Sequence, residues 1–122
     1  MRKRVAVAII EHDPLTCKVL MGLLQKAKWV RVLAAYSDVE SALRRISRDR
    51  PHVILVDLEL PRRSALTCLP ALKASVAGLK IVALAGRHEL DRVFQAFPAG
   101  ADACLSKEES GAQFVRSLRN FC

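Results

Sequence analysis

Apolar and polar residues along this chain follow two different spacings in turn. Short, continuous apolar runs predict strands buried on both faces of a sheet, and apolar residues spaced three or four apart predict helices that bury one stripe. The predicted strands are Val5–Ile10, Val30–Tyr36, Val53–Val56, Lys80–Ala85 and Ala101–Leu105. A helical stripe follows each of them. Strand and helix therefore alternate five times, which predicts a parallel α/β sheet with right-handed crossovers and helices on both faces.

The first helix is predicted to run from Pro14 to about Ala27. Asp13 can accept hydrogen bonds from the free N–H groups of the first turn, and proline fits the first helical position. The expected apolar face of this helix consists of Leu15, Val19, Leu20, Leu23 and Leu24.

The second and fifth helices are predicted to begin at capping boxes, in which a hydroxyl and a side chain three residues later satisfy free backbone N–H groups. The two boxes are Ser37-Asp38-Val39-Glu40 and Ser110-Gly111-Ala112-Gln113. Leu43 and Ile46 are expected to face inward from the second helix. The apolar stripe of the fifth helix consists of Phe114, Val115, Leu118 and Phe121.

The third and fourth helices are predicted beside prolines. Ser64 can cap the third helix, and Pro70 should kink that helix or end its first part early, because proline has no N–H for the helical ladder. The fourth helix is expected from about His88 to Phe97, where a Pro-Ala-Gly sequence ends it. Phe94 and Phe97 are expected to divide between the core and an exposed face.

Composition indicates one domain with a basic surface. A chain of 122 residues, 52% of them hydrophobic, suits one core, so residues 1–122 are assigned to a single domain. Lys and Arg number 20 against 12 Asp and Glu, which gives a formal net charge of +8. This excess could favour nucleic acid, an anionic membrane surface or an acidic partner. The basic residues are scattered, however, so a solvated surface explains most of them.

Cysteine usage and the lengths of the apolar runs bear on location. Four cysteines without a C-x-x-C or metal-finger spacing indicate reduced thiols in a cytoplasmic protein. No apolar run is long enough to span a membrane. The basic segment Met1–Arg4 precedes an apolar run, as in a signal peptide, but Glu11 and Asp13 interrupt that run and no small-residue cleavage site follows.

Three chemically active side chains stand at the carboxyl ends of predicted strands. Glu11 follows the first strand, Asp57 the third and Lys107 the fifth. These strand ends meet at one edge of a parallel sheet, where open α/β sheets bind ligands, so the three residues are expected to converge. Clustered carboxylates favour a hard divalent cation such as magnesium. A lysine beside them could hold a phosphoryl oxygen, and a carboxylate there could attack phosphorus.

Together, the segments Ile9–Pro14, Val53–Pro61 and Gly100–Lys107 resemble the receiver domain of two-component response regulators, and the resemblance covers essentially the whole chain. It implies a doubly wound, flavodoxin-like (βα)5 fold with the strand order 2-1-3-4-5. It also implies that Asp57 accepts a phosphoryl group from a sensor histidine kinase or a phosphotransfer protein. On this resemblance the chain is a cytoplasmic signalling module and not an enzyme.

The same resemblance implies roles for single residues. Asp57 would carry the phosphoryl group and Lys107 would contact it. The implied magnesium site consists of Glu11, His12, Asp57 and Glu59, with Glu59 supplying a backbone carbonyl. Receivers also use the face of the fourth helix, fifth strand and fifth helix for contacts, so a homodimer through the last two helices is one expected assembly. The sequence after the lysine is similar to regulators with a DNA-binding effector domain, which is absent from this chain.

Three departures from the family pattern bear on function. His12 stands where a second metal-binding acid is usual, Ala85 where a hydroxyl is usual, and Cys104 where an aromatic ring is usual. One hypothesis is a phosphorylatable receiver with a weakened magnesium site and an altered switch. The alternative is a pseudo-receiver, in which protonated His12 replaces the charge of the metal and fixes one conformation for protein binding. Nucleic-acid binding is a third, weaker hypothesis, because no recognition motif accompanies the charge.

Overall fold

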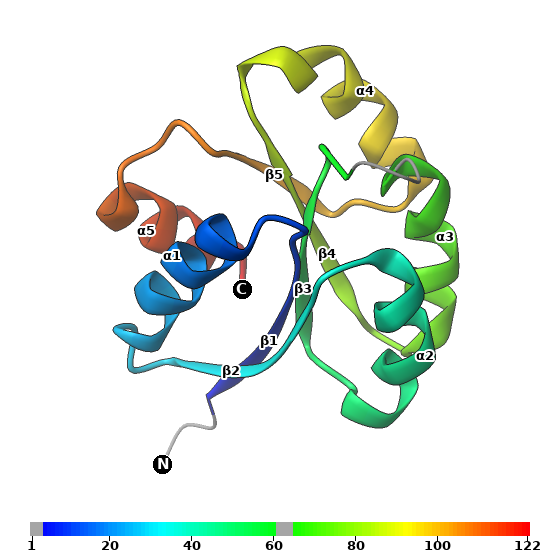
Figure 1. Ribbon diagram of the computed structural model, residues 1–122, viewed down its shortest axis with the longest axis horizontal. Helices are drawn as coiled ribbons and strands as arrows, with labels where there is room; N and C mark the ends of the chain where they lie inside the picture. Colours follow the sequence, from blue (N-terminus) through cyan, green and yellow to red (C-terminus); the bar gives the residue numbers. More distant parts are fainter. Residues whose placement is uncertain (1–3, 61–64) are drawn as a thin grey trace.

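Five parallel strands form one sheet in the order β2-β1-β3-β4-β5 (Figure 1). The computed structural model describes residues 4–60 and 65–122. The strands are β1 (Val5–Ile10), β2 (Val30–Tyr36), β3 (Val53–Asp57), β4 (Lys80–Ala85) and β5 (Ala103–Ser106). The helices are α1 (Pro14–Gln25), α2 (Val39–Asp49), α3 (Ala65–Ser75), α4 (Leu90–Ala99) and α5 (Gly111–Phe121), with a 3-10 turn, η1 (Arg87–Glu89), before α4. The alternation and the strand order confirm the doubly wound, flavodoxin-like fold.

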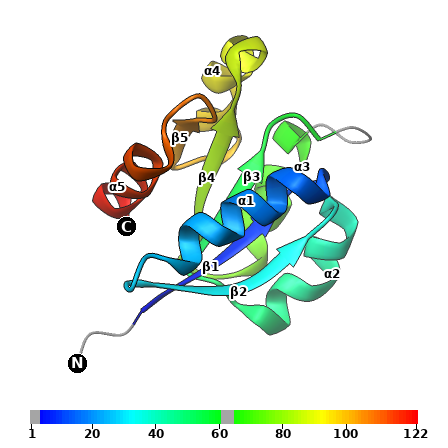
Figure 2. The same ribbon diagram turned by 60° about the vertical axis from the view of Figure 1, so that its left-hand side comes forward.

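The helices lie in two layers. α1 and α5 cover one face of the sheet, and α2, α3 and α4 cover the other (Figure 1 and Figure 2). β3 lies between β1 and β4 at the centre, and all of its residues are buried. Successive residues of a strand point to opposite faces. Ile54 therefore joins the apolar cluster under α2, α3 and α4, while Leu55 joins the cluster under α1 and α5.

Backbone pairing determines where the strands begin and end. The predicted bounds of β1, β2 and β4 are confirmed, and β3 extends one residue further, to Asp57. β5 is predicted to begin at Ala101 but begins at Ala103. Before it, Asp102 donates its N–H to the Ile81 carbonyl and accepts the Ile81 N–H on its carboxylate. These two bonds hold the loop against β4, so regular pairing starts only after Asp102.

α1 buries less of its predicted apolar face than expected. It begins after the N-cap Asp13, as predicted, but ends at Gln25 instead of about Ala27. Leu15 and Val19 are 70% and 56% exposed, so their assignment to the buried face is wrong. The helix packs on the sheet mainly through its later turns, where the side chain of Leu24 is fully buried. Its first turns therefore present apolar side chains to solvent.

Besides the cap of α1, one predicted helix cap is correct and another is displaced by one residue. α2 is capped by Asp38 and not by Ser37, because the Asp38 carboxylate accepts the N–H of Ser41. Ser110 caps α5 as predicted, with its hydroxyl accepting a backbone N–H of the first turn. The predicted cap at Ser64 lies outside the described residues.

Prolines do not end the two helices that contain them. α3 continues through Pro70 to Ser75, so of the two predicted effects the early end is wrong, and the kink stays a prediction. Pro70 is exposed, which gives its ring room on the solvent side of the helix. α4 starts at Leu90, after η1, and includes Pro98, so both of its predicted bounds move two residues towards the C-terminus. Gly100 ends α4 with a φ of 129°, a conformation that favours glycine.

Besides Leu15 and Val19 on α1, two large apolar side chains are exposed on α4. In the described ranges, no helix is long and apolar enough to cross a lipid bilayer. On α4, Phe94 is 82% exposed and Phe97 is 48% exposed. Neither belongs to the core, so the prediction that one of them would be buried is wrong. Ala96 is fully buried instead, because its small side chain lets the helix approach its neighbours closely.

Candidate functional site

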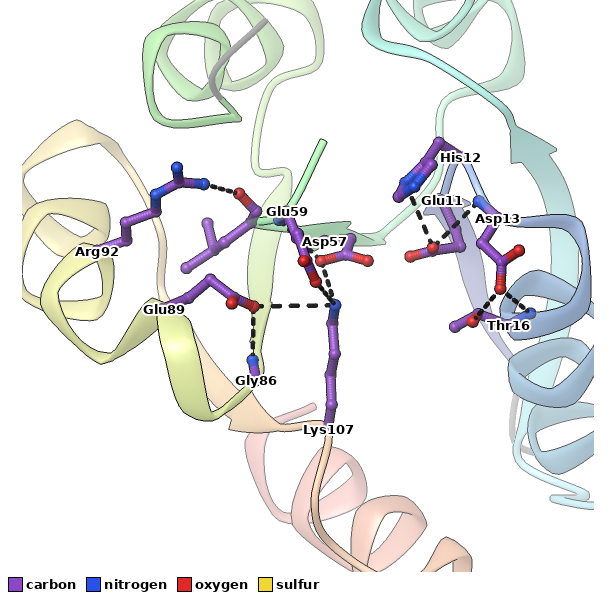
Figure 3. A network of polar contacts seen from close by, with 11 residues as sticks. Glu11, His12, Asp13, Thr16, Asp57, Glu59, Gly86, Glu89, Arg92 and Lys107 are labelled. Atoms are coloured by element: carbon purple, nitrogen blue, oxygen red, sulfur yellow. Dashed lines mark hydrogen bonds and ion pairs between the residues drawn. The ribbon is translucent and has the colours of Figure 1, made fainter. Parts of the chain in front are cut away.

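The carboxyl edge of the sheet brings Asp57 and Lys107 into contact. Lys107 Nζ lies 2.6 Å from Asp57 Oδ1, which is an ion-pair distance (Figure 3). The side chain of Asp57 is only 1% exposed. Glu11 reaches the same edge from the end of β1 and is also buried. The structure therefore brings together the three residues whose convergence the sequence predicts.

Backbone hydrogen bonds just beyond the strands hold these residues in place. The N–H of Glu11 donates to the Tyr36 carbonyl and continues the pairing of β1 with β2. The N–H of Lys107 donates to the Ala85 carbonyl and continues the pairing of β5 with β4. Asp57 is itself the last residue of β3. The sheet, and not a set of loops, thus positions all three side chains.

Glu11, His12 and Asp57 form a group that could hold a cation. One ligand atom from each lies within 4.8 Å of the other two. Glu11 Oε2 is buried and has no hydrogen-bond partner among the described residues. His12 Nδ1 lies 3.7 Å from Glu11 Oε1, which is too far for a direct hydrogen bond. An unsatisfied buried carboxylate oxygen is unfavourable, so these residues fit a divalent cation.

Glu59 lies on the other side of Asp57 from this group. Its N–H donates to Asp57 Oδ1 at 2.9 Å. Its side chain is 65% exposed, and Oε2 lies 3.4 Å from Lys107 Nζ. Its carboxylate forms a second acidic group with Asp57 and Glu89, separate from the group with His12. The structure thus places the Glu59 side chain beside the lysine.

Burial and neighbouring charges shift the pKa values of the two carboxyl groups at this edge, Glu11 and Asp57. Burial, followed by the neighbouring carboxyl group of Asp57, raises the pKa of Glu11 from 4.5 to about 8. Burial opposes ionisation of Asp57, but its interactions with Glu11 and Lys107 outweigh burial and hold the pKa of Asp57 below its usual range. In the absence of a cation, Glu11 is therefore protonated and Asp57 ionised at neutral pH.

The structure places two further residues at the site that sequence reasoning does not identify. Glu89, at the end of η1, is 5% exposed and accepts the N–H of Gly86. Arg92 on α4 donates from Nη1 to the carbonyl of Leu58 at 2.7 Å. The sequence carries a signal for Glu89, because an acid can accept the backbone N–H of the residue three positions before it, which here is the first residue after β4. Arg92 has no comparable signal.

Comparison with known proteins identifies the family. Residues 7–119 match the family model described as the response regulator receiver domain. The chain belongs to the response regulator receiver family. The receiver also superposes on the signal receiver domain of the response regulator NarL from Mycobacterium tuberculosis, with a TM-score of 0.87 and 22% identity. That match covers 98% of this chain and 96% of the other, and it shows that the two share a fold.

Curated relatives of this receiver are larger proteins. It is 26% identical over 120 residues to a protein-glutamate methylesterase/protein-glutamine glutaminase of Pseudomonas syringae pv. tomato, which covers 98% of this chain and 32% of that protein. It is 27% identical over 115 residues to the probable transcriptional regulatory protein TcrX of Mycobacterium tuberculosis, which covers 94% of this chain and 48% of that protein. The chain thus spans about a third to a half of the length of these relatives.

Two of the departures from the family pattern lie on β4 and β5. Ala85 ends β4, is 6% exposed and offers no hydroxyl. Cys104 on β5 packs against the apolar cluster under α2, α3 and α4, and burial raises the pKa of its thiol. A neutral thiol is a weak hydrogen-bond donor. Neither side chain can therefore give a strong hydrogen bond to a group bound on Asp57.

Proposed function

We propose that this receiver accepts a phosphoryl group on Asp57 from a phosphohistidine of a histidine kinase or a phosphotransfer protein. The observation that supports this most directly is the ion pair between Asp57 and Lys107, with 2.6 Å between Oδ1 and Nζ. The lysine keeps a buried carboxylate ionised at neutral pH. An ionised carboxylate is the form that can act as a nucleophile toward phosphorus.

In the proposed transfer, one oxygen of Asp57 attacks the phosphorus of the phosphohistidine. A P–O bond forms as the P–N bond breaks, and the electron pair of that bond stays on the imidazole, which takes up a proton. Asp57 Oδ1 already accepts hydrogen bonds from Lys107 and from the N–H of Glu59, so we assign the attack to Oδ2. Lys107 lies close enough to neutralise charge on the transferred group.

Glu11, His12 and Asp57 would hold the divalent cation in this proposal, with the backbone carbonyl of Glu59 as a further ligand. A cation bound there would neutralise negative charge on the reacting oxygens. Magnesium prefers oxygen ligands, so the imidazole of His12 weakens the preference for magnesium over metals that accept nitrogen. Glu11 must release its proton to act as a ligand, so cation binding is expected to strengthen as the pH rises toward its pKa of about 8.

The contacts of His12 favour this function over the pseudo-receiver. A protonated His12 that replaced the cation would have to satisfy the buried carboxylate of Glu11. The His12 side chain is 40% exposed and its Nδ1 stays 3.7 Å from Glu11 Oε1. Glu11 Oε2 has no hydrogen-bond partner in the described part of the chain. His12 therefore does not occupy the position beside Glu11 where a positive charge would replace the metal ion.

For assembly, we propose pairing of two copies through α4 and α5. Phe94 and Phe97 expose apolar rings on α4, and an apolar surface of this kind is stabilised by burial against a partner. Sedimentation at micromolar concentration, before and after phosphorylation, measures this directly. A monomer in both states would exclude pairing through this surface, and a dimer that survives the double substitution Phe94→Ser and Phe97→Ser would place the interface elsewhere.

Acetyl phosphate tests the proposed function through the intact mass of the protein. We expect the wild type to gain one phosphoryl group when magnesium chloride is present and not in a chelating buffer. Asp57→Asn should gain none. Asp91→Asn, which removes an exposed carboxylate from α4, is the matched control and should behave like the wild type. A gain in Asp57→Asn, or no gain in conditions that label another receiver, would contradict the proposal.

A further inference from the structure

Glu89 is a buried carboxylate that the transfer reaction does not use. It is 5% exposed, and its Oε1 accepts the N–H of Gly86 at 2.9 Å. The same oxygen lies 3.9 Å from Lys107 Nζ (Figure 3). A buried charge is unfavourable unless donors or opposite charges compensate it. Glu89 therefore occupies a position in which one backbone N–H and one ammonium group offset the cost of burial.

These two groups are also the ones available to a phosphoryl group on Asp57. Oxygens of Asp57, Glu59 and Glu89 lie within 4.8 Å of one another, so a group attached to Asp57 would enter the space beside Glu89. Its negative oxygens would require hydrogen-bond donors. Ala85 offers no hydroxyl, and the N–H of Glu59 already donates to Asp57 Oδ1. Lys107 and the N–H of Gly86 are the further donors at the adjoining strand ends.

We propose that Glu89 is a positioning residue that takes the place of the phosphoryl group in the unphosphorylated protein. Its carboxylate holds Gly86 and the η1 turn at the site through the donors that the phosphoryl group would otherwise use. The inference rests on the proposed function, because the competing group is the one carried by Asp57. Glu89 itself is not a catalytic residue, since it acts through Gly86 and Lys107.

The proposal makes Glu89 and the phosphoryl group competitors. Two like charges within about 5 Å repel each other strongly in a partly buried site. Phosphorylation therefore displaces the Glu89 carboxylate, and with it the η1 turn that leads directly into α4. Arg92 ties α4 to the carbonyl of Leu58 next to Asp57, so movement of η1 is resisted at a second point. Removing the charge of Glu89 should make the site easier to phosphorylate.

The first measurement compares the rates of phosphoryl uptake from acetyl phosphate, read by intact mass. Glu89→Gln removes the charge and keeps a hydrogen-bond acceptor, while Glu89→Ala removes both. We expect both variants to take up the phosphoryl group about tenfold faster than the wild type, because one repulsive charge is gone. Asp91→Asn makes the same change of net charge at an exposed position two residues away and should leave the rate unchanged.

The second measurement is the amide resonance of Gly86 in two-dimensional NMR spectra, recorded before any phosphodonor is added. A hydrogen bond to a carboxylate is short and moves the amide proton downfield. We expect Glu89→Ala to move this resonance upfield, Glu89→Gln to move it less, and Asp91→Asn to leave it in place. This signature separates the proposed contact from a general effect on stability.

The outcomes distinguish the inference from the proposed function. Labelling of the wild type with unchanged rates in both Glu89 variants would overturn the inference and leave the function standing, as would a Gly86 resonance that does not respond to Glu89→Ala. No labelling of any variant would overturn the function, and a Gly86 response would then still support Glu89 as the occupant of the site. If Glu89→Ala fails to fold, Glu89→Gln provides both measurements.

Discussion

Glu11 and Asp57 show how two neighbouring carboxyls take opposite protonation states. Asp57 has an ammonium group 2.6 Å away and is ionised, whereas Glu11 Oε2 has no donor among the described residues and keeps a proton. A divalent cation would change the state of Glu11, because a ligand carboxyl must be deprotonated. Lys107 thus helps to keep Asp57 in the ionised form, which is the form that can act as a nucleophile.

This difference predicts a pH-dependent stability. The pKa of Glu11 is about 8 in the folded protein against an ordinary value of 4.5. Between these values the folded state binds one more proton than the unfolded state, so the free energy of unfolding decreases as the pH rises from 4.5 to about 8. Glu11→Gln lacks this carboxyl and should lose less stability than the wild type across the same pH range. Denaturant unfolding in a chelating buffer measures the difference, and parallel pH profiles for the two proteins would show the prediction to be wrong.

Single residues differ in how far the sequence reveals them. The convergence of Glu11, Asp57 and Lys107 is predictable because each directly follows an apolar strand, and parallel strands end at one edge. Glu89 is not predicted to reach the site because its place depends on the η1 turn, which bends the chain back toward Gly86. The local sequence can indicate the bond from Gly86 to Glu89, but a 3-10 turn has no apolar periodicity that would place the side chain beside Lys107.

At the scale of elements, local signals predict helix starts better than helix faces. Asp13 and Ser110 cap α1 and α5 as predicted, because a cap needs only the residue and the next turn. Phe94 and Val19 are exposed although apolar, because burial depends on which neighbour the helix packs against. The same dependence explains why Ala96, a small residue, is the one that is buried on α4.

Two glycines in or beside helices should respond to alanine in opposite directions. Gly100 follows α4 with a φ of 129°, and a Cβ there would have room, with its nearest contact at 3.8 Å, so the cost is one of backbone strain. Gly100→Ala should lower the free energy of unfolding by about 1–3 kcal/mol. Gly22 lies within α1, where a Cβ would meet nothing within 4 Å, and Gly22→Ala should raise the free energy of unfolding by about 0.5–1 kcal/mol. Urea unfolding of both variants checks this, and equal effects would contradict it.

At the scale of the molecule, one sheet carries an apolar cluster on each of its faces. Ile54 and Leu55 are adjacent and fully buried, but each lies in a different cluster. The alternation of strand and helix is sufficient to predict this layered arrangement from the sequence. By contrast, the apolar pattern of this chain does not predict that its curated relatives are longer proteins.

Because one sheet carries both clusters, damage to either face should destabilise the whole domain. Ile54→Ala and Leu55→Ala should each lower the free energy of unfolding by about 2–5 kcal/mol, in a single transition. Val19→Ala, at a position 56% exposed, should change it by less than about 0.5 kcal/mol. Circular dichroism and tryptophan fluorescence, followed together in urea, measure the transitions. Two separate transitions in either core variant would mean that the faces unfold independently.

The hydrogen bond from Gly86 to Glu89 is formed within one chain, so it needs no second molecule. A phosphoryl group on an aspartate, by contrast, comes from another protein and is lost by hydrolysis. In the proposed competition, the Glu89 carboxylate returns to Gly86 as soon as that group is gone. The chain itself therefore restores the resting state, and the lifetime of the signal is set by the hydrolysis alone.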